Sequence, residues 1–250
     1  MKITARINTF NEEDNIAAAL DTLRWADEIL VVDSFSTDHT VEIARRYTDR
    51  VISHPFASHG AQHNYADSLC THDWVLTLDA DERLTPELIA AIERLRQRGP
   101  AADGYSMARR AWYLGRWIRH SGWYPNRQTR LYRRALTQWA GEPPHEAPKV
   151  QGRVEPLDGD MLHYTRRSLR EHVAIMNTYT DLASAARHRA GRRGSRLRLA
   201  LTPPLVFLRS YLLKQGFRDG WPGVVIAHAA ASYVMFREAK LLERDLPPTS

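Results

Sequence analysis

The stretch Trp74-Val75-Leu76-Thr77-Leu78-Asp79-Ala80-Asp81-Glu82-Arg83 decides which fold the chain can adopt. Five mostly apolar residues of β-favouring type run without a turn residue into three carboxylates. A continuous apolar run of this length is typical of a strand that is buried on both faces, as in a parallel sheet. Because open α/β sheets bind their ligands beyond the carboxyl ends of the strands, the acidic end of this strand is a candidate site.

Asp79 and Asp81 are the chemically informative pair of this stretch. In extended backbone, side chains two residues apart leave the chain on the same side. Two carboxylates on one side can share a divalent cation, and hard oxygen ligands suit Mg or Mn. The alternative is an acidic turn, or residues that cap the next helix, so the spacing alone leaves both interpretations open.

The residues before this stretch repeat a strand-and-helix pattern. Short apolar strands are predicted at 3–10, 29–33 and 50–53, and a helical segment follows each of them. Such alternation indicates a parallel sheet with helices on both faces, so the predicted fold class is α/β. Phe10, Asn11 and Asp33 then join the two aspartates at one sheet edge, which predicts a nucleotide crevice there.

Local signals predict where the helices of this half begin. Acidic residues at 12–14 are expected in the first turn of the first helix, where the helix dipole favours them. Ser36 or Thr37 is placed to cap the second helix. Thr85 and Pro86 have the N-cap and first-position preferences of a helix start.

Composition and charge bound the class of protein. The chain of 250 residues is 43% hydrophobic and 26% charged, which is typical of a globular protein with one large core. A single cysteine, Cys70, excludes an internal disulfide framework and fits a reducing compartment. Acidic residues within 1–20 argue against a signal peptide, and no uncharged apolar run of about 18 residues predicts a spanning helix.

The positive charge is concentrated at the end of the chain. The whole chain has a net charge of +6, and residues from Arg187 onward contribute +8, so the preceding residues sum to −2. A basic tail can face anionic lipid, nucleic acid or an acidic partner, and charge alone does not choose among them. Neither G-x-G-x-x-G after the first strand nor G-x-x-x-x-G-K-[ST] occurs, which disfavours a dinucleotide cofactor and a P-loop ATPase.

An ordered set of motifs resembles that of family-2 glycosyltransferases. The three in the first half are Thr9-Phe10-Asn11-Glu12, Val31-Val32-Asp33-Ser34-Phe35-Ser36-Thr37-Asp38-His39-Thr40 and Leu78-Asp79-Ala80-Asp81-Glu82. Three later segments are similar to the bacterial lipopolysaccharide core glucosyltransferase branch: 125–134 with Arg130-Leu131-Tyr132, Pro144-His145-Glu146, and 214–221. The resemblance covers nearly the whole chain. It implies a GT-A (Rossmann-like) fold, with a mixed, mainly parallel sheet flanked by helices and a C-terminal amphipathic helical extension.

The resemblance also implies roles for the residues of the nucleotide-sugar half. Phe10 would stack on uracil, and Glu12 and Asp33 would accept hydrogen bonds from the nucleoside. Asp79 would approach the ribose and a Mg or Mn ion, and Asp81 would ligate that ion at the diphosphate of a UDP-sugar donor. The remaining contacts to the nucleotide-sugar are expected from Thr9, Asn11, Gln62, Asn64 and Ala80.

An inverting transferase of this kind needs a general base for the acceptor hydroxyl. Glu146 is the predicted base, and Glu142 is the alternative. His145 is a candidate metal ligand, or it orients its neighbour, or it packs in the loop. The commoner family motif is Glu-Asp, whereas this chain has the His-Glu pair of the core-transferase branch. His163, which ends a predicted strand segment, is a weaker metal-ligand candidate than the two aspartates.

Aromatic and basic residues interleave between the predicted strands 104–110 and 127–133. Aromatic rings stack on sugars and arginines bind phosphates, so this segment is a candidate acceptor site. The alternative is hydrophobic cover for the sheet. The predicted acceptor residues are Trp112, Trp117, Trp123 and Arg130.

The tail has the composition of an interfacial anchor. A dense arginine cluster at 187–198 precedes the apolar segments 199–213, interrupted by Pro203-Pro204, and 224–236. Basic residues beside short apolar helices suit attachment to an anionic membrane surface. The alternatives are packing on the catalytic domain and dimer formation. No nucleic acid is expected as a partner, because the tail aromatics lie outside the arginine cluster.

Together these observations predict a GT-A catalytic domain at 1–168 and a basic helical extension at 169–250. Residues 1–100 would form the nucleotide-sugar half and 101–168 the acceptor-side half. The expected activity is inverting transfer of glucose from UDP-glucose to a heptose of the lipopolysaccharide inner core, on a lipid-linked acceptor. The expected location is peripheral, on the inner face of the cytoplasmic membrane. The alternatives are transfer to a polyprenyl phosphate or another envelope glycan, and a non-catalytic nucleotide-sugar-binding or scaffold protein.

Overall fold

The acidic-ended strand β4 (Trp74–Asp79) lies inside a nine-stranded sheet, between the parallel strand β1 (Ile3–Thr9) and the antiparallel strand β8 (Asn126–Arg133). The computed structural model describes residues 1–141, 146–165 and 168–246. The strand order is β3-β2-β1-β4-β8-β6-β11-β5, with β7 beside β6. The other strands are β2 (Glu28–Asp33), β3 (Val51–Ser53), β5 (Glu82–Leu84), β6 (Gly104–Tyr113), β7 (Arg116–Trp117) and β11 (Val154–His163). A separate ladder joins β9 (Thr137–Ala140) and β10 (Ala147–Val150).

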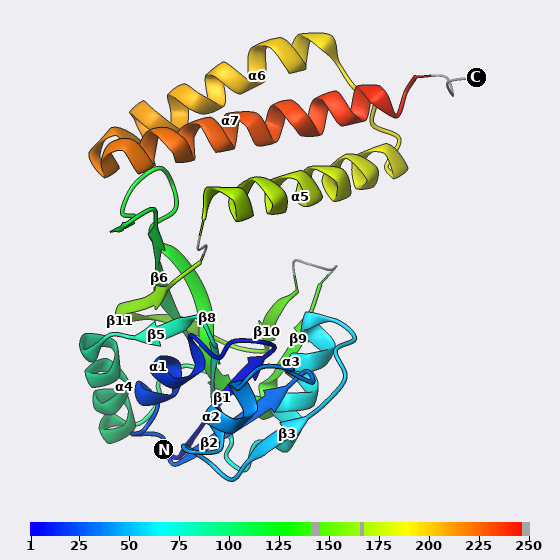
Figure 1. Ribbon diagram of the computed structural model, residues 1–250. Helices are drawn as coiled ribbons and strands as arrows, with labels where there is room; N and C mark the ends of the chain where they lie inside the picture. Colours follow the sequence, from blue (N-terminus) through cyan, green and yellow to red (C-terminus); the bar gives the residue numbers. More distant parts are fainter. Residues whose placement is uncertain (142–145, 166–167, 247–250) are drawn as a thin grey trace. The chain divides into compact units, whose positions relative to one another are not determined.

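The alternation of side chains along the strands builds a core on each face of this sheet. Leu76 and Leu78 face a cluster that holds apolar residues of α1 (Ile16–Asp21), α2 (Thr40–Ala44) and α4 (Pro86–Arg98). Val75 faces the opposite cluster, together with Ala66 of α3 (His59–Leu69). Neighbouring residues of a strand point to opposite faces, so a run that is apolar throughout requires helices on both sides. This arrangement confirms the predicted α/β fold class, with a mixed sheet flanked by helices (Figure 1).

Two of the predicted helix starts are wrong, and one is confirmed. Helix α1 begins at Ile16, so the acidic residues 12–14 precede the helix. Helix α2 begins at Thr40 without a cap from Ser36 or Thr37. Thr85 caps α4 as predicted, since its hydroxyl accepts a hydrogen bond from the Leu88 N–H at 3.3 Å.

The loops after β1 and β2 bind one another, which explains both differences. The Glu13 carboxylate accepts a hydrogen bond from the His39 N–H at 3.0 Å, at the start of α2 rather than at the start of its own helix. The Ser36 hydroxyl instead donates to Asp33. Asn11 has a φ of 53°, and its side chain accepts a hydrogen bond from the Thr37 N–H at 2.8 Å. The start of α2 therefore receives hydrogen bonds both from the other loop, through Glu13, and from its own loop, where Asp38 accepts from the Thr40 N–H at 3.0 Å.

The chain divides into two compact units. The first, called the catalytic unit below, comprises Met1–Arg109 and Asn126–His163, and the second, the helical unit, comprises Arg110–Pro125 and Tyr164–Ser250. The division differs from the predicted boundary at 168, because residues 110–125 group with the C-terminal helices. Their Tyr113 and Ile118 are buried with Ile226 in a small core of the helical unit.

Three long helices dominate the helical unit: α5 (Leu169–Arg189), α6 (Arg196–Leu208) and α7 (Gly220–Glu243). Helix α7 packs against both others and lies between them in Figure 1. The predicted interruption at Pro203-Pro204 is wrong, since α6 runs through both prolines and continues into a π-helical turn, η2 (Arg209–Leu213), which a short 3₁₀ turn, η3 (Gly216–Asp219), follows. Within the described parts of the chain, no helix is both long and apolar enough to cross a bilayer.

Candidate active site

A cavity of about 270 Å³ lies at the carboxyl ends of β1 and β4 in the catalytic unit. This is the sheet edge at which the sequence predicts a nucleotide crevice. The predicted site residues that line this cavity are Thr9, Phe10, Glu12, Gln62, Asp79, Ala80 and Asp81. Asn8, Ser34, Phe56, His59, His63 and His163 complete the lining. The strand ends thus bring together polar groups that lie up to 155 residues apart in the sequence.

Asp79 is held by an arginine beneath the cavity. Arg130 Nη2 donates to Asp79 Oδ2 at 2.6 Å and to Glu82 Oε1 at 2.9 Å. Although burial opposes ionisation of Asp79, the Arg130 charge holds the pKa of that carboxyl well below its usual range. Burial raises the pKa of Glu82, which is fully enclosed and also accepts a hydrogen bond from the Asp79 N–H at 3.1 Å. Asp79 is therefore an ionised carboxylate in a fixed orientation, and Glu82 is a support behind it.

Asp81 faces His163, which the sequence offers only as a weaker metal-ligand candidate. His163 Nε2 lies 3.1 Å from Asp81 Oδ2, and both side chains line the cavity. His163 is the last residue of β11, whose antiparallel pairing with β5 sets it opposite Glu82. Its position at a predicted strand end is the signal that points to it in the sequence. An oxygen and a nitrogen donor converge here, as a shared cation requires.

His63 lies over the inner part of the cavity and is uncharged at neutral pH. Burial, reinforced by the positive charge of Arg6, lowers the pKa of His63 to about 2. Its Nδ1 accepts hydrogen bonds from Arg6 Nη1 at 2.8 Å and from Asn8 Nδ2 at 3.2 Å, so the ring proton is on Nε2. The ring stacks on Trp139 at 3.6 Å between centroids. His63 can thus donate one neutral hydrogen bond, but it supplies no positive charge for a phosphate.

Arg6 is fully buried inside β1, and its charge is satisfied from three directions. Its guanidinium donates to Asp67 Oδ1 at 2.6 Å and to the Tyr132 hydroxyl at 2.8 Å, in addition to His63. Trp139 Nε1 donates to the same hydroxyl at 2.9 Å. A charged residue inside an otherwise uncharged, buried strand is the sequence signal for this network, which orients His63 and ties α3 to the sheet.

The chain is similar to a known protein family and to several known proteins. The sequence model of a protein family described as glycosyl transferase family 2 matches residues 5–148, which is more than half of the chain. The chain belongs to glycosyl transferase family 2. Because all the cavity-lining residues except His163 lie within the matched region, the cavity is part of the family domain.

Relatives and solved structures agree with this membership. The glycosyltransferase is 28% identical over 251 residues to the lipopolysaccharide core biosynthesis glycosyltransferase LpsC of Rhizobium meliloti, covering 98% of this chain and 93% of LpsC. It is 31% identical over 257 residues to an uncharacterized glycosyltransferase of Rickettsia prowazekii, covering 98% and 87%. The crystal structure of Staphylococcus aureus TarS 1-349 in complex with UDP-GlcNAc is 16% identical, with a TM-score of 0.51 over 97% of this chain and 89% of that one, and supports the fold.

Three residues that the sequence assigns to the nucleotide-sugar site of this glycosyltransferase lie outside the cavity lining. Asp33 is buried and accepts hydrogen bonds from the Ser36 N–H and hydroxyl, at 2.9 and 2.5 Å. Asn64 exchanges two hydrogen bonds of 2.9 Å with the backbone of Trp139. Asn11 holds the neighbouring loop through Thr37. In this structure each of them shapes the walls of the site.

The predicted base, Glu146, lies beside the start of α3 in the catalytic unit. The Ser58 hydroxyl donates to Glu146 Oε1 at 2.7 Å. A Cβ at Gly60 would come within 2.7 Å of the same oxygen, so a larger residue there would make the Glu146 carboxylate shift. Glu146 Oε2 is buried and has no hydrogen-bond partner in the described residues. His145, the third predicted metal ligand, and Glu142, the alternative base, lie outside the described residues.

The predicted acceptor residues divide between the two units. Arg130 is buried in the catalytic unit beneath Asp79. In the helical unit, Trp112 and Trp117 pack edge to face at 5.0 Å, and Tyr164 lies 5.3 Å from Trp117. Trp123 packs on the buried Tyr113 of the same unit. All three tryptophans are half-buried, and Trp123 also packs against the small core of the helical unit.

Proposed function

We propose that this glycosyltransferase moves a sugar with inversion from a UDP-sugar to the inner core of lipopolysaccharide. The observation that carries the proposal is the strand-end cavity, which is lined by an exposed aromatic ring, Phe10, and by two aspartates, Asp79 and Asp81. The expected donor is UDP-glucose, and the expected acceptor position is a heptose. The similarity to LpsC, whose name states lipopolysaccharide core biosynthesis, supports this class of acceptor.

Donor binding is assigned to the walls of the cavity. Phe10 is 56% exposed at the mouth and offers a ring face on which uracil can stack. Glu12, and Asp33 behind it, would accept hydrogen bonds from the nucleoside. Asp79, fixed by Arg130, would accept from the ribose hydroxyls. This division leaves Asp81 for the diphosphate end of the donor.

A divalent cation fits the donor set around Asp81. The Asp81 carboxylate and the His163 imidazole, 3.1 Å apart, would hold Mg or Mn, and the ion would neutralise charge on the departing diphosphate. In the described part of the chain, no group of three or more histidine, cysteine or acidic residues is positioned for a metal ion. Two protein ligands leave positions for phosphate oxygens, as in sites that bind a metal together with its substrate.

Acceptor activation is assigned to Glu146. Inversion in one displacement requires a base that removes the proton of the attacking hydroxyl as the bond to UDP breaks. Ser58 orients one carboxylate oxygen, and the other has no hydrogen-bond partner among the described residues.

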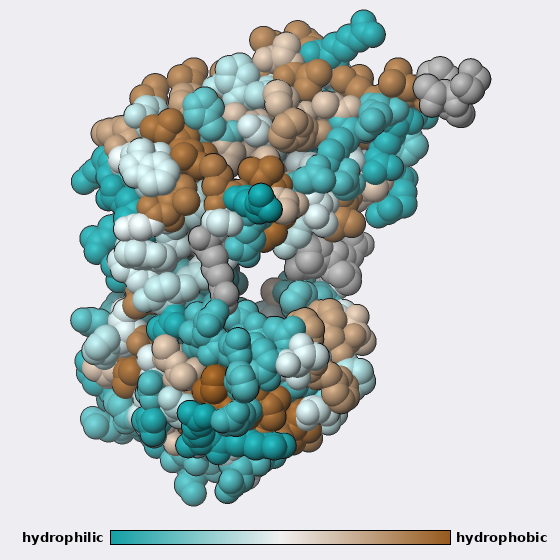
Figure 2. Space-filling view, viewed as in Figure 1, coloured by the Kyte–Doolittle hydropathy of each residue, from teal (hydrophilic) through white to brown (hydrophobic). Residues whose placement is uncertain are grey.

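Attachment to a membrane is assigned to an exposed row of leucines on α6 and its continuation. This leucine stripe consists of Leu197, Leu201, Leu205, Leu208 and Leu212, which are between 48% and 68% exposed. Their spacing of three or four residues places them on one helix face. Figure 2 shows apolar side chains gathered at the surface over α6 and α7. An apolar face beside basic residues suits a peripheral position on the inner face of the cytoplasmic membrane, where a lipid-linked acceptor is within reach.

The test is a donor screen with the purified protein, in which UDP release is measured with a core-saccharide acceptor and with Mg, Mn or a chelator. We expect turnover with UDP-glucose that depends on the metal. Asp81→Asn and His163→Gln should each lower kcat/KM by about 100-fold, roughly 3 kcal/mol, because each removes a metal ligand.

The matched control is Asp21→Asn, which changes an exposed carboxylate paired with Arg24. Turnover that survives the chelator and both cavity variants would contradict the metal assignment. Donor binding without any transfer would instead favour a non-catalytic nucleotide-sugar-binding protein.

A further inference from the structure

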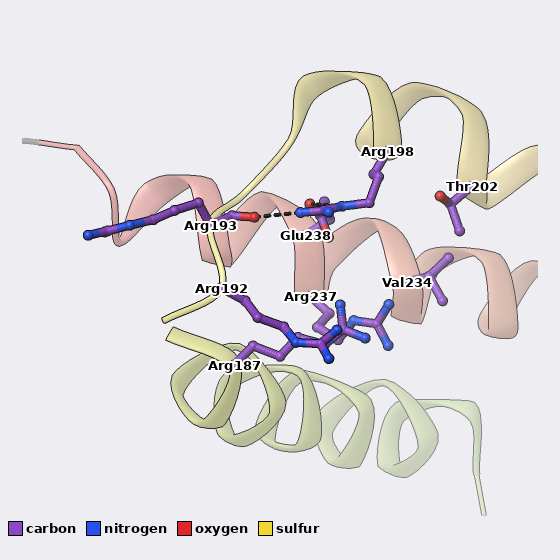
Figure 3. A pocket seen from close by; sticks show the side chains of 8 residues that line it. All are labelled: Arg187, Arg192, Arg193, Arg198, Thr202, Val234, Arg237 and Glu238. Carbon is purple, nitrogen blue, oxygen red and sulfur yellow. Dashed lines mark hydrogen bonds and ion pairs between the residues drawn. The ribbon is translucent and has the colours of Figure 1, made fainter. Parts of the chain in front are cut away.

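The helical unit contains a second cavity, of about 510 Å³, whose lining is dominated by arginine. This arginine pocket lies among the end of α5, the linker that follows it, α6 and α7 (Figure 3). It is lined by Arg187, Arg192, Arg193, Arg198 and Arg237, with Thr202, Val234 and Glu238. Five guanidinium groups meet one carboxylate, so the pocket carries excess positive charge. Its volume is within the range of small-molecule sites.

Two of the five arginines are matched by acidic residues. Arg198 Nε pairs with Glu238 Oε1 at 3.0 Å, and Glu238 is almost fully buried. Arg193 Nη1 pairs with Asp245 at 2.6 Å, and its side chain extends away from the other arginines in Figure 3. No carboxylate of the described residues pairs with Arg187, Arg192 or Arg237. These three positive charges therefore lack a paired carboxylate in the described residues, and Arg237 instead lies 5.8 Å from the ring centroid of Tyr233.

Arg237 shows the consequence of this excess. Burial, followed by the positive charge of Arg187, lowers the pKa of Arg237. Its Nε is buried without a hydrogen-bond partner in the described chain. A buried guanidinium N–H without an acceptor is costly, and like charges in one pocket repel each other. An anion in the pocket would satisfy the N–H and relieve the repulsion.

The pocket adjoins the leucine stripe along α6. Its lining residues Arg198 and Thr202 each directly follow a leucine of the stripe, Leu197 and Leu201. Successive helical residues differ in direction by about 100°, so the anion site and the exposed apolar face lie on adjacent sides of one helix. A ligand with an acidic head and an apolar chain matches this arrangement.

We propose that the arginine pocket binds the phosphate or diphosphate head of a membrane lipid whose chains lie against the leucine stripe. Phosphate groups suit the pocket because they carry up to two charges and accept paired hydrogen bonds from guanidinium groups. The proposal deepens the membrane attachment in the proposed function, and it requires neither the donor cavity nor sugar transfer.

The experiment measures binding of the full chain to phosphatidylcholine vesicles that contain either phosphatidic acid or phosphatidylserine, at matched surface charge. We expect tighter binding to phosphatidic acid, whose headgroup is a phosphate monoester. The variant Arg187→Gln/Arg192→Gln/Arg237→Gln should lose this preference, with at least about a 10-fold loss of affinity for phosphatidic acid vesicles.

The control variant is Arg189→Gln/Arg196→Gln/Arg209→Gln, which removes the same charge from exposed positions of the same unit. It should weaken binding to both vesicle types alike and keep the preference for phosphatidic acid. Equal losses in the two triple variants, or no preference in the wild type, would overturn the pocket assignment.

A soluble competitor distinguishes the lipid from a free phosphate source. Inorganic phosphate and a soluble sugar phosphate should compete only weakly with phosphatidic acid vesicles. If either raises the melting temperature through the three pocket arginines and abolishes the vesicle preference at similar concentrations, the site binds soluble phosphate and the lipid assignment is wrong.

Two controls test whether the Gln triple variant acts through misfolding: its melting temperature and a variant that keeps the charge. The Gln triple variant should melt no lower than the wild type at low salt, because it removes like-charge repulsion. Arg187→Lys/Arg192→Lys/Arg237→Lys keeps the charge but not the paired donors, so it should bind phosphatidylserine normally and lose the preference. Retained preference in the Lys variant would contradict specific phosphate recognition. Vesicle binding and melting temperature do not depend on glycosyl transfer, so these results would stay the same if the proposed transfer failed.

Discussion

At the residue scale, three acidic residues within four positions have three different environments. Asp79 is ionised and fixed by Arg130, Asp81 faces His163 in the cavity, and Glu82 is enclosed behind them. The difference arises from what each one meets across the sheet. The buried Arg130 guanidinium favours the charged form of Asp79. Burial raises the pKa of Glu82, which Arg130 also contacts. The three carboxylates of this motif therefore have different surroundings although their side chains are chemically alike.

Glu146→Gln tests the proposed base directly. The amide keeps the shape and the hydrogen bond from Ser58 but cannot accept a proton. We expect kcat for transfer to fall by about 10²- to 10⁴-fold, with an unchanged Kd for the UDP-sugar in calorimetry. Glu42→Gln, at an exposed helical position, is the matched control and should have wild-type activity. If transfer persists in Glu146→Gln and is lost in Glu142→Gln, the base is Glu142.

Asp67→Asn tests the buried network around Arg6. The substitution leaves a fully enclosed guanidinium without its counter-charge, so the free energy of unfolding should fall by about 3–5 kcal/mol. Urea denaturation followed by circular dichroism measures the change. The exposed pair Arg24–Asp21 supplies the control, because Asp21→Asn should not shift the midpoint. Equal stability of Asp67→Asn and the wild type would mean that His63 and Tyr132 suffice for Arg6.

At the element scale, the helices next to the site begin in two different ways. Helix α4 is capped by its own Thr85, whereas α2 receives the Glu13 carboxylate from the loop after β1. The second arrangement couples the two loops that flank the cavity, because each one supplies hydrogen bonds to the other. Asp38 of the same loop also accepts a hydrogen bond from the Thr40 N–H at 3.0 Å, so local sequence signals reveal only part of this helix start.

Thr85→Ala tests the local cap of α4. Loss of the hydroxyl leaves the Leu88 N–H without its partner and should destabilise the helix start by about 1 kcal/mol. Hydrogen exchange of peptides that cover 86–98 should then speed up by roughly fivefold if exchange proceeds through local opening. Thr85→Ser keeps the hydroxyl and should exchange as the wild type does. Unchanged exchange in the alanine variant would show that Pro86 and tertiary packing suffice.

At the scale of the whole molecule, charge and exposed apolar surface are concentrated in the helical unit. Residues from Arg187 onward carry a net charge of +8, in a chain of +6. The leucine stripe and the arginine pocket belong to the same unit, whereas the donor cavity belongs to the catalytic unit. Surface attachment and nucleotide chemistry can therefore be altered independently by mutation.

Leu201→Gln/Leu205→Gln/Leu208→Gln tests the leucine stripe as a membrane contact. A half-exposed leucine that becomes buried in a bilayer gains roughly 1 kcal/mol, so the triple variant should bind neutral phosphatidylcholine vesicles about 100-fold more weakly. Vesicle sedimentation measures the partitioning. The control, Leu169→Gln/Val173→Gln/Leu182→Gln, alters equally exposed residues of α5 and should bind as the wild type does. Wild-type binding of the stripe variant would exclude this face as the contact.

The sequence by itself determined the alternation of strands and helices in the first hundred residues, the α/β class and the acidic strand end. These features depend on local periodicity, since a run such as 74–78 can be satisfied only by burial on both faces. The resemblance of the motifs added glycosyltransferase family 2, which the family match then confirmed.

Only the tertiary structure decided which distant side chains meet. His163 reaches Asp81 through the antiparallel pairing of β11 with β5, and Arg130 reaches Asp79 from a strand added on the other side of β4. The tertiary structure also grouped residues 110–125 with the C-terminal helices and gathered three arginines without a paired carboxylate in the described residues into one pocket. Such contacts depend on register and packing between segments far apart in the chain, and local periodicity carries no information about either.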